Sequence, residues 1–411
     1  MSQLFTKTLK QAPSDEVSKN AQLLIRAGYV YKEMAGVYTY LPLGKLVLDN
    51  IIEIIRQEMN RSGGNEISMT ALQQKGPWEA SGRWSDEVMD VWFKTKLASG
   101  GELGLAPTHE EPLTKLMKSY ISSYKDLPAY PYQFQIKFRN ELRSKSGLMR
   151  GREFWMKDLY SFSRDQAEHD KFYESMADAY SVVYQRLGLG EITYKTFASG
   201  GSFSKYSHEF QTLSPVGEDT IYVHEAKQIA INEEVYNDEV LADLGIDKTE
   251  LVEQKAVEVG NIFTLGTRFS DALDLKYTAE DGSSHPVVMG SYGIGPSRLM
   301  GLIAEHFADD KGLIWPENIA PFKVQLVAIG EKGSSVADEL YEELTAKNVE
   351  VLYDDRNERP GAKFADAELM GMPARVTVSD RGVQAGSFEY TERASGETFV
   401  LTRDELLAKL M

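Results

Sequence analysis

Residues 138–162 read FRNELRSKSGLMRGREFWMKDLYSF, and this stretch decides how the rest of the chain is interpreted. The segments 132–139 and 153–162 are rich in aromatic residues that alternate with polar ones, which predicts two antiparallel strands. The segment between them contains a central glycine and predicts a long hairpin loop. Residues 137–152 contain six basic residues and only one acidic residue, Glu141. A basic hairpin loop in an acidic protein indicates a ligand that carries phosphate groups.

Strand alternation predicts which of these side chains share a face of the sheet. Arg139 and Glu141 are two residues apart, so both are expected on one side. The same spacing places four residues of the second strand together: Phe154, Met156, Asp158 and Tyr160. Such a face could hold a nucleotide, with arginine on phosphate, glutamate accepting from the adenine amine and phenylalanine stacking on the base. A solvated hairpin with incidental charges explains this segment, taken alone, equally well.

A second motif, VVMGSYGIGPSR, occupies residues 287–298. It predicts a strand that enters a glycine-rich turn, followed by a helix through LMGLIAEHF. A dinucleotide-binding fingerprint would have its third glycine where Arg298 stands, and no acidic residue follows at the expected spacing. Glycines that let a helix begin close to a strand, with an arginine in its first turn, fit a triphosphate better.

A third motif is PTHEE at residues 107–111. A hydroxyl group and carboxylates in one turn could bind an ammonium or imino group. For this motif alone the favoured alternative is a helix N-terminus with acidic residues in its first turn.

Composition limits the remaining possibilities. The 411 residues suggest two or three domains, and 42% hydrophobic with 26% charged residues is typical of soluble globular proteins. No run reaches the length of a membrane-spanning helix, and the N-terminus has no apolar signal region, so we expect a cytoplasmic protein. The absence of cysteine excludes disulfides, thiol nucleophiles and cysteine-based zinc sites, and no HExxH pair occurs. Any metal is therefore expected to be a hard, oxygen-bound ion such as Mg²⁺. The net charge of −17 argues against sequence-blind binding of nucleic acid, but allows one local basic patch.

The order of elements along the chain predicts a large domain followed by a small one. Apolar residues four apart predict helices over 44–61 and 165–187. The acidic segment 222–256 is interpreted as a surface linker or small excursion. The segment WPENIAP at 315–321 marks a domain junction, after which alternating strands and helices predict a small α/β domain over 321–411.

Taken together, the motifs resemble those of a known family. FRNE with RGREF is similar to motif 2, and GSYGIGPSR to motif 3, of class II aminoacyl-tRNA synthetases. Further segments resemble bacterial-type prolyl-tRNA synthetases in the right order over nearly the whole chain: YTYLPLGKLVLDNI, PWEASGRW, PTHEE, GGSFSKYSHEF, EVGNIFTLGTRFSDAL and DDRNERPGAKFADAELMGMP. The resemblance implies an α+β catalytic domain over 1–320, with an antiparallel sheet flanked by helices. It implies an anticodon-binding α/β domain over 321–411.

The same resemblance implies ATP-dependent ligation of L-proline to tRNA(Pro) through a prolyl-adenylate, with Mg²⁺, in a homodimer. Arg139 and Arg298 would be the catalytic residues. The residues implied for ATP are Arg139 at the α-phosphate, Glu141 at the adenine amine, Arg150 at the terminal phosphate, Phe154 beneath adenine, Arg298 on the other face, and Gln211. Those implied for proline are Thr108, Glu110, Arg139, Met156, Asp158 and Ser291. Those implied for tRNA are Arg143 and Lys145 at the acceptor end, and Arg356, Lys363 and Glu368 in the anticodon-binding domain; Glu209 is the candidate for Mg²⁺. For Lys363 and Glu368 a solvated helix face is an open alternative.

This chain departs from the family at four places. Thr70 stands where motif 1 normally has proline, Ser291 where cysteine is usual, and Asn261 where histidine is frequent. Only the excursion 222–256 occupies the place of the large editing insertion that many relatives carry. Three alternatives remain open at this point: a paralogue that loads another carrier, a non-catalytic tRNA-binding accessory protein, and a synthetase for threonine, glycine or serine.

Overall fold

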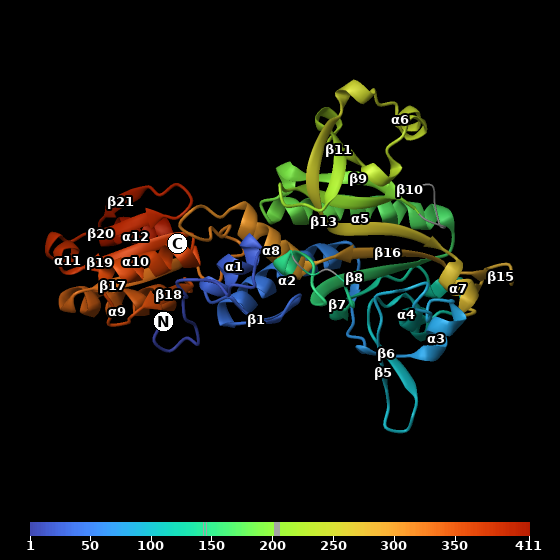
Figure 1. The fold of residues 1–411 in the computed structure, drawn as a ribbon, viewed down its shortest axis with the longest axis horizontal. Coiled ribbons are helices and arrows are strands. Elements are labelled where there is room, and N and C mark those ends of the chain that lie inside the picture. The colour runs from blue at the N-terminus through green and yellow to red at the C-terminus, as the bar shows by residue number, and fades with distance from the viewer. Residues whose placement is uncertain (143, 145, 201–205) are drawn as a thin grey trace. The chain divides into compact units, whose positions relative to one another are not determined.

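The computed structural model describes residues 1–142, 144, 146–200 and 206–411 (Figure 1). By internal contacts the chain forms two compact units. Unit 1 comprises Met1–Ile51, Lys145–Arg150 and Met300–Met411, and unit 2 comprises Ile52–Ser144 and Gly151–Leu299. The division of the catalytic and anticodon-binding domains at residue 320 follows chain order and stays a prediction.

Unit 2 is built on a nine-stranded, mainly antiparallel sheet. Its strands, in spatial order, are β10 (Tyr206–Leu213), β9 (Thr193–Ser199), β12 (Ile229–Asn232), β11 (Asp219–His224), β13 (Val252–Gly266), β16 (Val288–Ile294), β8 (Glu153–Ser163), β7 (Pro131–Phe138) and β3 (Asn65–Glu66), with an additional pairing of β10 with β13. The predicted hairpin strands are confirmed as β7 and β8, which pair antiparallel with Gln133 opposite Asp158. Strand β16 pairs with β8 on its other side, so motifs far apart in the sequence meet at the middle of one sheet.

One long helix covers a face of this sheet. Helix α5 (Gln166–Arg186) packs against β8, β13 and β16, which confirms the helix expected over 165–187 (Figure 1). Asp165 caps its N-terminus by accepting from the backbone N–H of Glu168. The buried face of α5 presents aromatic side chains, among them Phe172, Tyr180 and Tyr184. Helix α5 therefore covers one face of β8, β13 and β16.

Smaller elements surround the other face of the sheet. A three-stranded sheet contains β4 (Leu72–Gln74), β6 (Glu102–Leu105) and β5 (Phe93–Lys96), and β14 (Lys276–Thr278) pairs with β15 (Ser284–Pro286). The short helices nearby are α3 (Lys75–Ala80), α4 (Glu110–Met117) and α7 (Arg268–Ala272). Apolar residues from α4, α7, β8 and β16 form one buried cluster. This cluster fixes α4, and with it the PTHEE motif, beside the central strands.

The acidic segment 222–256 is folded, which corrects its interpretation as a linker. It contributes β12, and parts of β11 and β13, to the main sheet. Helix α6 (Asp238–Leu244) closes a small core of its own with Ile231, Val240, Leu241 and Ile246. The scattered isoleucine, valine and leucine residues of the segment supply this core, although the sequence has no long apolar run there.

Unit 1 contains the N-terminal segment and the C-terminal α/β domain. The N-terminal part has α1 (Lys19–Arg26), the hairpin β1 (Val30–Met34) with β2 (Val37–Tyr40), and the start of α2 (Pro42–Arg61), which confirms the helix predicted over 44–61. Helix α8 (Pro296–His306) follows the glycine-rich turn and continues from unit 2 into unit 1. The Tyr29 hydroxyl accepts from the indole N–H of Trp315 at 2.9 Å and donates to the carbonyl of Met370 at 2.8 Å. This buried chain of hydrogen bonds joins the N-terminal segment to the C-terminal domain.

The C-terminal domain has a five-stranded sheet in the order β18 (Val351–Asp354), β17 (Val324–Ile329), β19 (Ala374–Ser379), β20 (Phe388–Glu392) and β21 (Thr398–Leu401). The alternating strands and helices expected after residue 321 are confirmed, with α9 (Glu331–Ala346) and α10 (Pro360–Met370) between the first three strands. The sequence pattern had not indicated α11 (Asp380–Ala385), β20, β21 and α12 (Arg403–Leu410). Within the described residues, no helix is both long enough and apolar enough to span a membrane.

Candidate active site

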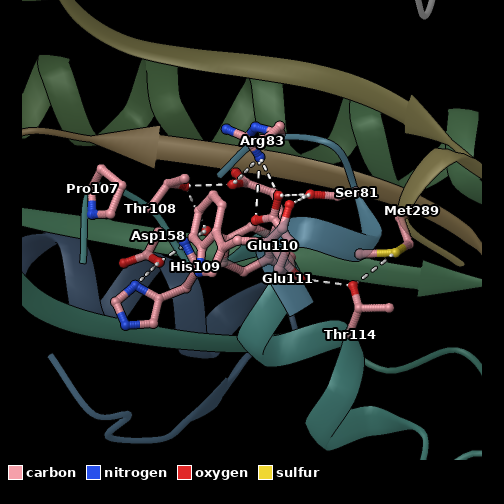
Figure 2. Close-up of polar contacts among 12 residues, drawn as sticks. Ser81, Arg83, Pro107, Thr108, His109, Glu110, Glu111, Thr114, Asp158 and Met289 are labelled. Atoms are coloured by element: carbon pink, nitrogen blue, oxygen red, sulfur yellow. Dashed lines mark hydrogen bonds and ion pairs between the residues drawn. The ribbon is translucent and has the colours of Figure 1, made fainter. Parts of the chain in front are cut away.

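The PTHEE motif forms the entrance to helix α4, on the sheet face that α5 leaves open. Glu110 and Glu111 lie in the first turn of α4, so the structural alternative for this motif is correct as far as the backbone goes. The side chains nevertheless point into a polar cluster rather than into solvent (Figure 2). The Thr108 hydroxyl lies 2.7 Å from Oε2 of Glu110 and 3.3 Å from the Tyr160 hydroxyl. The motif is therefore both a helix start and part of a site.

Asp158 and Tyr160 approach this loop from strand β8. They share a face as the alternation predicted, and the Tyr160 hydroxyl donates to Oδ2 of Asp158 at 3.1 Å. The same hydroxyl accepts from the backbone N–H of His109 at 3.1 Å. The single hydroxyl hydrogens of Thr108 and Tyr160 are thus used toward Glu110 and Asp158. The lone pairs of Thr108 remain as acceptors, which suits a ligand that donates hydrogen bonds.

Met156 and Ser291 belong to the same face by strand register. Met156, on β8, lies opposite Gln135 of β7. Ser291, on β16, lies opposite Tyr160 of β8 on one side and opposite Phe263 of β13 on the other. Both predicted residues are half-buried. They therefore line the sheet face next to the Thr108–Tyr160 contact.

Two arginines from different motifs lie near each other on this unit. The Arg139 guanidinium donates from Nε to the carbonyl of Pro107 at 3.3 Å and lies 5.4 Å from the ring centre of Phe154. Arg298 contacts Glu258 through its main-chain oxygen and, at 3.3 Å, its Oε2. Burial and the nearby charge of Arg298 lower the pKa of Arg139. Two cations held this close are stabilised by an anion between or beside them, and phosphate has the matching geometry.

The prediction that strand alternation places Glu141 on the same side of the sheet as Arg139 is wrong. Strand β7 ends at Phe138, and the backbone N–H of Glu141 turns back to the carbonyl of Arg139 at 2.8 Å, so alternation does not extend to these residues. The carbonyl of Glu141 accepts from Nε of Arg152. Arg150 ends the short turn Gly147–Met149 in unit 1 and is half-buried. Arg143 and Lys145 lie outside the described residues.

Gln211 and Glu209 are two residues apart on β10, so their side chains lie on the same face of the sheet. Where β10 pairs with β13, the register shifts between Phe210 and Gln211 because β13 has an extra residue there, Val259. The Gln211 amide donates to Oε2 of Glu209 and to Oδ2 of Asp219, both at 2.9 Å. Burial and the charge of Glu258 raise the pKa of Glu209 to about 7. Buried Oε1 of Gln211 has no hydrogen-bond partner. An orphaned amide oxygen beside a carboxylate that is costly to ionise fits a hard cation such as Mg²⁺, although the described residues contain no cluster of three or more metal-ligating side chains.

Sequence reasoning missed Arg83, which holds the two glutamates of PTHEE. Its Nη1 lies 3.2 Å from Oε2 of Glu110 and 3.1 Å from Oε1 of Glu111 (Figure 2). It also missed the buried pair of Lys137 and His109 beneath the loop. Arg83 lies in the segment PWEASGRW, just after helix α3, but no periodic pattern in that segment predicts which side chains it contacts.

In the C-terminal domain the three candidate tRNA residues differ in their surroundings. Arg356 pairs with Asp354 at 2.7 Å and with Asp366 at 2.9 Å. Lys363 is buried and donates to the carbonyls of Ala328 and Asp354, so the alternative of a solvated helix face is wrong for this residue. Glu368 is half-buried near the end of α10, where Lys311 lies 3.3 Å away.

Comparison with known protein families finds two matching regions in this chain. Residues 93–307 match the model of the tRNA synthetase class II core domain (G, H, P, S and T), and residues 323–411 match that of the anticodon binding domain. The fold class expected from the sequence is thereby confirmed.

Curated relatives match over the full length. Proline–tRNA ligase of Rhodopseudomonas palustris is 38% identical over 445 residues, covering 100% of this chain and 99% of the relative. The Geobacillus enzyme of the same name is 33% identical, covering 99% and 98%. That alignment runs over 560 positions although this chain has 411 residues, so a substantial part of the relative has no counterpart here.

Solved structures share the fold. Prolyl-tRNA synthetase of Cryptosporidium parvum, complexed with L-proline and AMP, superimposes with a TM-score of 0.76 at 19% identity, covering 95% of this chain and 73% of that chain. With its class II core, its anticodon-binding domain and relatives matched from end to end, this chain belongs to the proline–tRNA ligase family.

Proposed function

We propose that the protein activates L-proline with ATP and transfers it to tRNA(Pro). The observation that carries this proposal is the contact between Arg139 and the loop that holds Thr108 and Glu110. In this contact Nε of Arg139 donates to the carbonyl of Pro107. An anion-binding arginine therefore lies beside a group of hydrogen-bond acceptors. The arginine suits the phosphate of ATP and the carboxylate of proline, and the acceptors suit the ring nitrogen of proline.

The loop provides the chemistry to hold the prolinium nitrogen. A prolinium ion has two N–H donors and a positive charge, and Thr108 offers hydroxyl lone pairs while Glu110 offers a carboxylate. Met156, Asp158 and Ser291 form the rest of the amino-acid site in this proposal. Arg83 keeps Glu110 in place, because its guanidinium contacts that carboxylate directly.

In the first step an oxygen of the proline carboxylate attacks the α-phosphorus of ATP, and pyrophosphate leaves. Arg139 and Arg298 balance the charge that develops on the phosphate, without a covalent enzyme intermediate. In this proposal the nucleotide is held by Glu141, Phe154, Arg150 and Gln211. A Mg²⁺ held through Glu209 and Gln211 would neutralise phosphate charge when bound.

In the second step the terminal ribose hydroxyl of tRNA attacks the prolyl carbonyl, and AMP leaves. The proposed tRNA contacts are Arg143, Lys145, Arg356 and Glu368, with Lys363 supporting the Arg356 surface from beneath. The same proposal includes a catalytic domain over 1–320, an anticodon-binding domain over 321–411 and a cytoplasmic homodimer.

Amino-acid-dependent ATP–pyrophosphate exchange without tRNA tests the proposal. We expect strong exchange with proline and little with threonine, serine or glycine. The proline-dependent exchange should be abolished in Arg139→Ala. The control Arg164→Ala removes an exposed arginine that pairs with Glu168 of α5, and it should keep wild-type exchange. No exchange with any amino acid in folded protein would favour the tRNA-binding accessory alternative.

A further inference from the structure

Lys137 is a fully buried lysine directly beneath the PTHEE loop. It lies on β7 opposite Phe154, and its side chain has no exposed surface. Its ammonium lies 2.8 Å from Oδ1 of Asp158 and 2.5 Å from Nδ1 of His109. An ammonium group is costly to bury, and replacing buried ion pairs by apolar residues is often neutral or stabilising. Stability alone therefore does not account for a charged group at this position.

The contacts of His109 define its protonation state. Nε2 lies 3.1 Å from the carbonyl of Thr70, which can only accept, so Nε2 carries the hydrogen. Nδ1 is then a lone pair, and it accepts from the ammonium of Lys137. Burial and the charge of Lys137 lower the pKa of His109 to about 4, which keeps the ring neutral. Lys137 thereby holds His109 in a single tautomer and orientation.

Lys137 also reaches the PTHEE loop by a second route, through its ion pair with Asp158. Burial alone would raise the pKa of the Asp158 carboxyl, but the charge and the hydrogen bond of Lys137 lower it overall, so Asp158 is ionised. Its Oδ2 accepts from the Tyr160 hydroxyl and from the amide of Gln133, both at 3.1 Å. This fixes the Tyr160 hydroxyl, which in turn meets the backbone N–H of His109 and the Thr108 hydroxyl.

The contacts through His109 and those through Asp158 and Tyr160 therefore both end on the PTHEE loop. His109 is the residue between Thr108 and Glu110, and it is held from two sides through its ring and its backbone N–H. We propose that Lys137 is a positioning residue for proline: by holding His109 and Asp158 it sets where the Thr108 hydroxyl and the Glu110 carboxylate stand. This inference rests on the proposed function and adds a specificity-determining residue to it.

A second buried lysine provides a matched control. Lys157, on the adjacent strand β8, is also fully buried, but its side chain points toward α5. Its ammonium contacts the Tyr180 hydroxyl at 2.6 Å and the carbonyl of Tyr292 at 3.0 Å. Lys137→Met and Lys157→Met thus each remove one buried ammonium from neighbouring strands, and only the first touches the loop.

The experiment measures KM for proline and KM for ATP separately in ATP–pyrophosphate exchange. For Lys137→Met we expect KM for proline to rise roughly tenfold to a hundredfold while KM for ATP stays within about twofold, because misplaced binding groups cost that much. For Lys157→Met we expect no selective change in KM for proline. Equal values of KM for proline in the two variants, or an equal rise in both KM values for Lys137→Met, would overturn the positioning role.

Tyr160→Phe covers the case in which Lys137→Met does not fold. This change removes only the hydroxyl that joins Asp158 to the loop, so the same proline-selective rise is expected. Folded Tyr160→Phe with a wild-type KM for proline would overturn the inference. Wild-type protein is the reference in every case, since its failure to show exchange would count against the proposed function itself.

Discussion

Arg83 and Glu111 form an ion pair in which the carboxylate is completely buried. Nη1 of the arginine lies 3.1 Å from Oε1 of Glu111, and the Ser81 hydroxyl donates to the same oxygen at 2.7 Å. Burial raises the pKa of Glu111 to about 7 even though Arg83 lowers it. The start of α4 is thus held through the buried Glu111 carboxyl, and Arg83 supplies the cation that this carboxyl contacts.

Arg83→Met should therefore destabilise the protein and weaken proline binding together. Without Arg83 the buried Glu111 carboxyl takes up a proton and loses a hydrogen-bond partner, which costs roughly 1–3 kcal/mol. Chemical denaturation measures the first effect, and KM for proline in exchange measures the second. Lys75→Met is the control, since Lys75 pairs with Glu79 and Glu102 at the surface and should barely shift the unfolding midpoint. Equal midpoints for the two variants would contradict this prediction.

The pH dependence of stability should contain a contribution from His208. Burial, followed by the charge of Lys195, lowers the pKa of His208 to about 3, and its Nδ1 meets the Tyr173 hydroxyl at 2.7 Å. The folded state therefore binds fewer protons than the unfolded state below the ordinary histidine pKa. Stability is present above pH ~6.5 and is lost as the pH falls toward 3.

His208→Asn keeps a polar group near the Nδ1 position and removes the titration. Between pH 6.5 and 5 we expect the wild type to lose about 1.5 kcal/mol more unfolding free energy than the variant, from linkage of one proton. Denaturant titrations at the two pH values measure this difference. Parallel pH profiles would show that His208 is not held neutral in the fold.

The C-terminal domain should affect tRNA without affecting amino-acid activation. Arg356→Ala is expected to raise KM for tRNA several-fold in aminoacylation, because a cation of the proposed tRNA surface is lost, and to leave proline-dependent exchange unchanged. Arg403→Ala is the control, since Arg403 pairs with Glu343 on the same domain and is not part of the proposed surface. A similar KM for tRNA in both variants would remove Arg356 from the tRNA contacts.

Alanine should be activated measurably and not corrected by this chain. Alanine is smaller than proline, and rejecting a ligand that lacks a methylene is worth only about 1–3 kcal/mol per group. The alignment gap against the longer Geobacillus relative is consistent with a missing editing insertion. We expect alanine-dependent exchange, together with alanyl-tRNA that persists in the presence of the purified protein. Rapid hydrolysis of alanyl-tRNA would contradict this.

The sequence alone determined the parts of this protein whose pattern is local. Helices α2 and α5, the β7–β8 hairpin and the first strands of the C-terminal domain follow from apolar periodicity, and that periodicity exists because each element buries one face. Ordered motifs also indicated the family, since each motif preserves residue types that one chemistry requires. Strand alternation placed Asp158 and Tyr160 together for the same local reason.

Only the tertiary structure decided which distant residues meet. Alternation failed for Glu141, because β7 ends at Phe138, and the acidic segment 222–256 proved to be part of the main sheet. Arg83, His109 and Lys137 became part of the site only when α4, β7 and β8 packed together, since ion pairs between separate elements leave no periodic trace in the chain. Those buried contacts, rather than the motif residues alone, define the geometry that holds Thr108 and Glu110.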